Sequence, residues 1–170
     1  NGVKKSFHDD NLFADLAIID SNFIKNTDSK ILQNSAIDAC AQCSEAYDSK
    51  ISNPYTKFLC NVAFETLEDA ILTRNNEKLA LGSLISGLGF GNSSTTLGHA
   101  LSYVYSNEGF SHGHALAFTT QFAHQFNSSE YFVRFKKIVE EFNFEKIHLK
   151  QDPEKAAELI LEDRKHLDNN

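Results

Sequence analysis

Two histidines and an aspartate–glutamine pair are the residues of this chain whose types and spacing could bind a metal ion. His99 and His112 lie thirteen residues apart, each beside a glycine. Upstream, Asp38 and Gln42 are four residues apart, a spacing that places both side chains on one face of a helix. Imidazole nitrogens and side-chain oxygens are ligands of divalent metals. These four side chains therefore predict a metal site, provided that the fold brings three distant segments together.

Each of these residues also has a structural interpretation. A lone histidine between apolar neighbours, as at position 99, is usually a core residue with a satisfied hydrogen bond, and Asp38 with Gln42 is more often a solvated pair. The neighbours of this pair are small or apolar, however, which favours a buried helix. His112 follows a loop, where a side chain can face a cleft. His114 points about 200° away from His112 on a helix, so at most one of the two faces a shared site.

The remaining histidines and the cysteines lack such a pattern. We interpret as structural or surface residues the histidines His8, His124, His148 and His166. Cys40 and Cys43 have a redox or zinc spacing, but no second pair of this kind and no βαβ pattern accompany them, so a structural thiol pair is favoured. With Cys60 the cysteine count is odd, which fits a reduced compartment better than a disulfide framework.

Composition excludes several classes of function. Hydrophobic residues make up 41% and aromatic residues 11% of the 170 residues, which is typical of a packed globular protein. The 16 basic residues are scattered among 23 acidic ones, giving a net charge of -7 that disfavours nucleic acid as a partner. No apolar run approaches the ~20 residues of a membrane span, and the polar start lacks an apolar signal segment. We therefore expect a cytoplasmic protein.

The elements that must position the site are predicted to be helices after one short strand. The apolar run Phe13–Asp20 predicts that strand. The helical segments, from caps, breakers and apolar periodicity, are Asp28 or Ser29 to Tyr47, Pro54 to Ile71, Lys78–Phe90, Leu97–Tyr105, Ala115–Phe126, Tyr131–Phe142 and Glu154–His166. Four glycines between Gly82 and Gly91 indicate close helix packing or a functional reason, because each weakens a helix by about 1 kcal/mol relative to alanine.

Several motifs occur together in one order: residues 38–47, Asn53-Pro54, residues 87–93, residues 99–101 and residues 112–115. This series, from about Ala17 onward, resembles the iron-containing (group III) alcohol dehydrogenases. The resemblance implies a mainly α fold, namely the helical-bundle C-terminal domain of the dehydroquinate synthase-like/iron-containing alcohol dehydrogenase fold, with one short N-terminal strand.

The resemblance also implies a ligand set. In that family an aspartate, a histidine four residues later and two further histidines hold one divalent metal. The matching positions here are Asp38, Gln42, His99 and His112, so glutamine replaces one histidine. Its neutral amide oxygen is a harder and weaker ligand than an imidazole. Two histidines and one carboxylate suit Fe(II) with open positions, and Zn is the alternative.

The reaction implied is that of an NAD(P)-dependent alcohol dehydrogenase or aldehyde reductase acting on a small alcohol or aldehyde, with the metal polarising the substrate oxygen during hydride transfer. Tyr103 and His114 are candidates for the substrate or proton path because they lie near the ligands in sequence. Gln42, Tyr103 and the form of the second histidine motif look like the phosphonoacetaldehyde reductase subgroup. A homodimer is one possible assembly.

The domain organisation expected is that of a fragment. The chain shows neither alternating strands and helices nor a glycine-rich dinucleotide turn. Residues 1–25 are expected to be an N-terminal segment with a short strand, the remnant of or junction to a missing nucleotide-binding half. Residues 26–170 are expected to form the helical metal-binding catalytic domain, truncated at its C-terminus. Alone, this chain should show no dehydrogenase activity.

Two alternative functions stay open. A non-catalytic helical interaction module would explain the helices and leave the order of the histidine motifs to chance. Another metal-dependent enzyme of the same superfamily, glycerol dehydrogenase-like or dehydroquinate synthase-like, would share the helical domain. Metal analysis would distinguish the first alternative, and a substrate panel on the full-length protein would distinguish the second. The interpretation as a metal site fails if Asp38, His99 and His112 lie on different faces of the fold.

Overall fold

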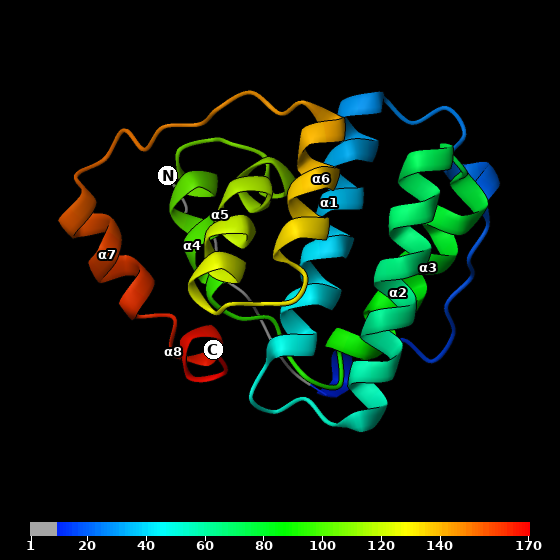
Figure 1. Cartoon of the computed structure of the whole chain (residues 1–170), viewed down its shortest axis with the longest axis horizontal. Coiled ribbons are helices and arrows are strands. Elements are labelled where there is room, and N and C mark those ends of the chain that lie inside the picture. Colours follow the sequence, from blue (N-terminus) through cyan, green and yellow to red (C-terminus); the bar gives the residue numbers. More distant parts are fainter. Residues whose placement is uncertain (1–9) are drawn as a thin grey trace.

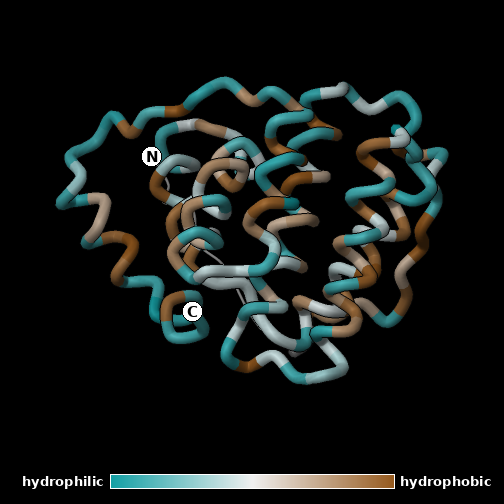
Figure 2. The backbone as a smooth tube through the Cα atoms, viewed as in Figure 1, coloured by the Kyte–Doolittle hydropathy of each residue, from teal (hydrophilic) through white to brown (hydrophobic). Residues whose placement is uncertain are grey.

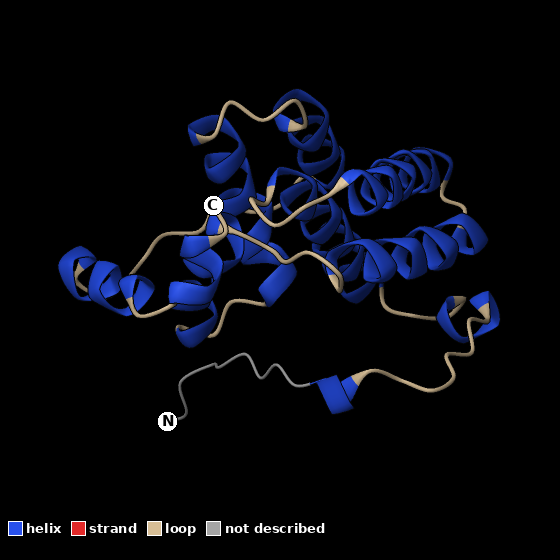
Figure 3. Cartoon of the chain, turned by 90° about the horizontal axis from the view of Figure 1, so that it is seen from below, coloured by secondary structure: helices blue, strands red, loops and turns tan. Residues whose placement is uncertain are grey.

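Every regular element in residues 10–170, the part of the chain described by this computed structural model, is a helix (Figure 3). The elements in chain order are the 3-10 helices η1 (Asp10–Leu12) and η2 (Ser21–Ile24) and the α-helices α1 (Ser29–Asp48), α2 (Pro54–Thr73), α3 (Asn76–Phe90), α4 (Leu97–Asn107), α5 (His112–Phe126), α6 (Phe132–Phe142), α7 (Pro153–Leu161) and α8 (Arg164–Asp168). His8 lies outside the described residues. Within residues 10–170 no helix combines the length and apolar character needed to cross a membrane.

Helix α1 lies in the middle of the molecule, with α2 and α3 on one side and α4 and α5 on the other, and α6 overlaps α1 in this view (Figure 1). Helix α6 also contacts α2, since Arg134 donates a hydrogen bond to the Glu68 carboxylate. It begins as predicted, since the Asp28 carboxylate accepts hydrogen bonds from the backbone N–H groups of Lys30 and Ile31. Its buried residues are mostly small: Ala36, Ile37, Ala39, Cys40, Ala41, Cys43, Ser44, Glu45 and Ala46. Small side chains allow neighbouring helices to approach α1 from several directions.

Helices α2 and α3 pack against each other over their whole length. Pro54 occupies the first turn of α2, as the sequence predicts, and the structure adds that Asn53 caps this helix through a reciprocal capping box. The close packing expected from the glycine-rich stretch is confirmed at two positions. A Cβ added to Gly89 would lie 2.7 Å from Cys60 Sγ, and one added to Gly82 would lie 2.8 Å from Leu67 Cγ. Glycine is therefore needed where α3 crosses α2.

Helices α4 and α5 form a second pair, joined by a short turn. Gly109 in this turn has a φ of 97°, in the left-handed region that favours glycine. The link between α6 and α7 is largely hydrophilic (Figure 2). It is attached to the same turn, because the Glu108 carboxylate accepts hydrogen bonds from the backbone N–H groups of Lys150 (2.9 Å) and Gln151 (2.8 Å).

The C-terminal segment differs from the single helix expected for Glu154–His166. It forms α7 and the five-residue α8, separated by a break at Glu162 and Asp163, and the Asp163 carboxylate accepts a hydrogen bond from the His166 backbone N–H. Both helices contact α4. Residues 169 and 170 are fixed to the segments just after α1 and α5 by three hydrogen bonds. Lys50 N–H donates to the Asn169 carbonyl (3.0 Å), and the Asn127 and Asn170 amides donate to each other (2.6 and 3.1 Å).

The predicted strand at Phe13–Asp20 is wrong. The structure has no strand in residues 10–170, and this segment is irregular and exposed, with Leu16 and Ile18 78% and 77% accessible. A strand needs a partner whose backbone groups complete the ladder, and the described chain offers none here. The segment has the apolar composition of a strand but lacks the neighbouring strand with which it would pair.

Candidate metal centre

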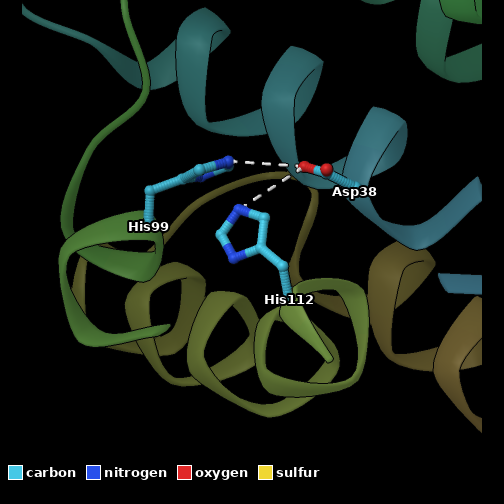
Figure 4. A group of neighbouring side chains, drawn as sticks. All are labelled: Asp38, His99 and His112. Carbon is cyan, nitrogen blue, oxygen red and sulfur yellow. Dashed lines mark ion pairs between the residues drawn. The ribbon is translucent and has the colours of Figure 1, made fainter. Parts of the chain in front are cut away.

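Asp38, His99 and His112 converge on one point, as the sequence predicts (Figure 4). One potential ligand atom from each lies within 4.8 Å of the other two. Asp38 Oδ1 is 3.6 Å from His99 Nε2 and 4.0 Å from His112 Nε2. The three residues come from three helices, α1, α4 and α5, and two nitrogens with one oxygen form a donor set that suits a divalent transition metal.

The two histidines stand at the beginnings of their helices, where close approach to α1 is possible. A Cβ on Gly98, the residue before His99, would lie 2.2 Å from Glu45 Oε1 and 2.9 Å from Thr120 Cα. A Cβ on Gly113, the residue after His112, would lie 2.0 Å from the Asn34 carbonyl oxygen of α1. These two glycines therefore set the distance at which α4 and α5 present their imidazoles to Asp38.

Each imidazole uses its Nδ1 atom for a hydrogen bond away from the centre. His99 Nδ1 lies 3.2 Å from the carboxylate oxygen Oε1 of Glu45. His112 Nδ1 lies 3.2 Å from the Ser102 hydroxyl, which donates its own proton to the His99 carbonyl oxygen at 2.7 Å. Both Nδ1 atoms are thus placed as N–H donors, which leaves both Nε2 atoms facing Asp38 as the potential ligand atoms. This is the arrangement expected of metal-binding histidines.

Glu45, fully buried on α1, is a residue of this centre that sequence reasoning missed. Its Oε2 atom accepts hydrogen bonds from the backbone N–H groups of Thr96 (2.7 Å) and His99 (3.3 Å) and from the Thr96 hydroxyl (3.1 Å). Its Oε1 atom accepts from the Thr120 hydroxyl (3.0 Å) as well as from His99. Thr96 makes no side-chain cap at the start of α4, and Glu45 satisfies these backbone groups instead.

The electrostatics of the centre favour a cation. Burial alone would raise the pKa of Glu45, but His99 and the surrounding hydrogen bonds lower that pKa to about 2, so Glu45 is ionised at neutral pH. Burial alone would lower the pKa of His99, but the carboxylates of Glu45 and Asp38 raise it to about 9. A proton and a divalent cation compete for the same imidazole nitrogen. The negative charge of the two carboxylates stabilises whichever of these two cations is bound to His99.

Comparison with known proteins decides the family. Residues 33–168 match the Fe-containing alcohol dehydrogenase family, C-terminal. The chain belongs to the iron-containing alcohol dehydrogenases. Over 124 residues it is 33% identical to the 4-hydroxybutyrate dehydrogenase of Clostridium kluyveri, a match that covers 66% of this chain and 33% of that protein. The NADPH-dependent butanol dehydrogenase of Clostridium saccharobutylicum is 22% identical over 151 residues, covering 83% of this chain and 38% of that protein.

Solved structures show the same fold. The crystal structure of sulfoacetaldehyde reductase from Bifidobacterium kashiwanohense, in complex with NAD+, superposes with a TM-score of 0.74 at 21% identity. That match covers 89% of this chain and 48% of the other. The chain therefore spans a third to about half the length of these iron-containing alcohol dehydrogenase relatives.

Gln42, the fourth ligand position implied by the resemblance, makes a hydrogen bond to Asp38. Its Nε2 atom donates to Asp38 Oδ1 at 3.0 Å. The amide N–H group rather than the amide oxygen thus faces the proposed ligand atom. For Gln42 to act as a ligand of an iron-containing alcohol dehydrogenase, its amide must turn about its terminal bond.

The two candidates for the substrate or proton path lie in different surroundings. The Tyr103 ring stacks on His112, with centroids 6.0 Å apart and an angle of 24° between planes. His114 instead contacts the rings of Phe110, Phe118 and Phe144, and its Nε2 atom lies 2.6 Å from the Glu145 carbonyl oxygen. The structure therefore places Tyr103 against His112 of the candidate metal centre and His114 in an aromatic cluster.

His166, interpreted from sequence as structural or surface, is buried beside the centre. Its ring is parallel to that of His99 with centroids 6.2 Å apart, and it meets Tyr103 edge-on at 5.7 Å. Asp163 fixes the orientation of this imidazole, since Oδ2 lies 2.7 Å from Nδ1. The three-residue spacing of Asp163 and His166 is the one sequence signal for the contact between them, and nothing in the sequence links position 166 to position 99.

A second group of side chains has the residue types of a catalytic triad without access to substrate. His124 Nε2 lies 2.8 Å from the Ser44 hydroxyl, and His124 Nδ1 lies 3.5 Å from Asp48 Oδ2. Ser44 and His124 are 0% and 1% accessible, and the Ser44 hydroxyl donates to the Cys40 carbonyl oxygen. Because both side chains are buried, no substrate reaches Ser44, and this group has a packing role. His124 is thus a structural residue, one of the two roles that the sequence predicted for it.

The cysteines are free and buried. Cys43 Sγ donates to the Cys40 carbonyl oxygen at 3.3 Å, and burial raises the pKa of both thiols. Reactive or metal-binding cysteines need a stabilised thiolate. Cys40 and Cys43 therefore have the structural role favoured by the sequence.

Proposed function

We propose that this chain is the metal-binding helical domain of an NAD(P)-dependent alcohol dehydrogenase or aldehyde reductase, with Asp38, His99 and His112 as the ligands of one divalent ion. The observation that carries the proposal is the convergence of Asp38 Oδ1 with the Nε2 atoms of both histidines. Family membership supports it, and the hydrogen bonds at both Nδ1 atoms fit it. A non-catalytic helical module would have no need of this arrangement.

The donor set favours Fe(II), with Zn as the alternative, because two imidazoles and one carboxylate leave coordination positions open. Held by these residues, a divalent ion would supply Lewis-acid polarisation of the substrate oxygen. The side chains of Asp38 and His112 are 28% and 26% accessible, whereas that of His99 is 6% accessible. Substrate would therefore approach from the side of Asp38 and His112, with the Tyr103 ring stacked behind His112.

The cofactor and substrate belong to the same proposal. Because this chain spans about half or less of its relatives' length, we place NAD(P) binding on a part of the enzyme outside residues 26–170, with residues 1–25 as the junction. The relatives' names refer to 4-hydroxybutyrate, butanol and sulfoacetaldehyde, which are short molecules with or without an anionic end. We accordingly propose a short alcohol or aldehyde as the substrate.

Metal binding tests the ligand assignment directly. Titration of the chain with Zn²⁺ against a chelator should give one site per chain. Loss of a residue that only hydrogen-bonds to a metal ligand lowers metal affinity by about 10–100-fold. Replacing Asp38, His99 or His112 by alanine removes a ligand itself, so each variant should lose more Zn²⁺ affinity than that.

His114→Ala is the matched control, because His114 lies on the same helix as His112 and contacts an aromatic cluster. It should bind Zn²⁺ like the wild-type chain. Unchanged affinity in the Asp38, His99 and His112 variants would refute the assignment.

A further inference from the structure

The buried carboxylate of Glu45 faces donors that differ between its two oxygens. Oε2 accepts hydrogen bonds from two backbone N–H groups, those of Thr96 and His99. Oε1 accepts from the His99 ring nitrogen Nδ1 and from the Thr120 hydroxyl. Backbone N–H groups can only donate, whereas a hydroxyl can donate or accept and a neutral imidazole nitrogen can do either, depending on its tautomer. The protein therefore fixes which atom of residue 45 must be an acceptor.

We propose that Glu45 is a positioning residue that holds His99 with its proton on Nδ1 and its Nε2 lone pair directed at the metal site. This inference rests on the proposed function. It assigns the carboxylate a role beyond capping α4: because Oε1 accepts only, the ring atom facing it must be N–H, and the other ring nitrogen is then the ligand atom. Asp38 and Glu45 are seven residues apart on α1, so one face of one helix supplies both a ligand and the group that orients another ligand.

If Glu45 has this role, glutamine should not be able to replace it, although the two side chains have nearly the same size. In Glu45→Gln the amide oxygen must take the Oε2 position, because two backbone N–H groups point there. The amide NH₂ group then takes the Oε1 position and faces His99 Nδ1. Thr120 can turn its hydroxyl to accept, but two N–H groups cannot face each other, so His99 must move its proton to Nε2 or turn away. Either change removes the lone pair from the metal site without altering side-chain volume.

Zinc titration of the 170-residue chain and two variants tests this role. We expect Glu45→Gln to lower Zn²⁺ affinity by about 10–100-fold. Thr120→Val is the matched control: it removes one hydrogen bond from the same carboxylate oxygen, keeps the volume, and leaves the contact between Glu45 and His99 intact. It should bind Zn²⁺ within about threefold of the wild-type chain, since the ligand-orienting contact is unchanged. Circular dichroism without metal reports whether each variant is folded.

Nitrogen NMR of the histidines gives a readout that a merely structural role would not move. In the Zn²⁺-loaded wild-type chain and in Thr120→Val, the His99 signals should show zinc on Nε2 and a proton on Nδ1. In folded Glu45→Gln the Nδ1 proton signal should be shifted or lost at His99, while the signals of His112, oriented by Ser102, should not change.

The outcomes separate this inference from the proposed function. If the wild-type chain binds no Zn²⁺, both fail. If it binds Zn²⁺ and folded Glu45→Gln binds equally well, or Thr120→Val loses as much affinity, the role of Glu45 is overturned while the metal site stands. Should Glu45→Gln not fold, the wild-type spectrum decides: zinc on His99 Nδ1 overturns the inference, and zinc on Nε2 with a proton on Nδ1 supports it.

Discussion

Gln42 and Asp38 form a hydrogen-bonded pair within the proposed metal site, and this pair sets the chemistry of the site apart from a three-histidine site. The Gln42 amide N–H group donates to Asp38 Oδ1, the carboxylate oxygen nearest to both imidazoles. This bond orients the Asp38 carboxylate beside the two imidazoles. A softer nitrogen ligand at position 42 would instead bind a transition metal directly.

Replacing Gln42 by histidine should therefore strengthen metal binding. A residue that only hydrogen-bonds to a metal ligand contributes at least about tenfold to metal affinity. Because Gln42→His adds a ligand, we expect it to raise Zn²⁺ affinity by at least that factor. The same competitive titration measures it. Gln42→Ala, which removes the hydrogen bond without adding a ligand, is the control and should bind no more tightly than the wild-type chain. A fall in affinity in Gln42→His would show that position 42 cannot reach the ion.

At the scale of elements, α4 and α5 reach α1 only because glycine stands next to each metal-site histidine. Gly98 lies against Glu45 and Thr120, and Gly113 lies against the backbone of Asn34. The Ser111 hydroxyl also donates to the Asn34 amide oxygen at 2.7 Å, so α5 begins at a fixed place on α1. Packing of this kind tolerates no added methyl group, because the neighbours include backbone atoms.

Gly98→Ala should destabilise the chain by about 1–3 kcal/mol, the usual cost of overpacking, and should weaken metal binding as well. Urea unfolding measures the first effect and zinc titration the second. Gly87→Ala is the control, since nothing lies within 4 Å of a Cβ at that exposed helical position. There alanine should be neutral or stabilise the protein by up to about 1 kcal/mol through helix propensity. Equal stability of the two variants would contradict the packing argument.

For the whole molecule, the sequence predicted those features that depend on interactions between residues close together in the chain. Asp28, Asn53 and Pro54 mark helix starts through contacts with the next three residues, so these boundaries were predicted correctly. The Phe13–Asp20 strand was predicted wrongly, because a strand depends on a partner elsewhere. Asp38, His99 and His112 were found through a family resemblance, whereas Glu45 and His166 were missed because their roles arise from helices that meet only in the folded chain.

The interface between α2 and α3 gives the whole fold a predictable response to alkaline pH. Burial raises the pKa of the Cys60 thiol from 9.0 to about 12. The folded chain therefore keeps this thiol neutral at pH values where the unfolded chain ionises it. The neutral, buried thiol contributes fully to the free energy of unfolding below pH 9. As the pH rises from 9 towards 12, the free energy of unfolding falls by about 1.4 kcal/mol for each pH unit.

Urea unfolding of the wild-type chain and Cys60→Ala between pH 7 and pH 12 checks this sign. The difference in unfolding free energy between the two proteins should be constant up to about pH 9, the pKa of an unperturbed thiol, and should then shift against the wild-type chain. A difference that stays constant to pH 12 would show that the thiol is not protected.

The central position of α1 has a kinetic consequence. Asp38 lies in the middle of this helix, between Ile37 and Ala39, which are 0% and 4% accessible, and α1 contacts five other α-helices. Segments packed in this way open only when much of the molecule unfolds, whereas helix ends open often. An ion held by Asp38 would therefore not be released by fraying of α1, and the α1 amides around residue 38 should exchange hydrogen more slowly than those at the ends of the helices.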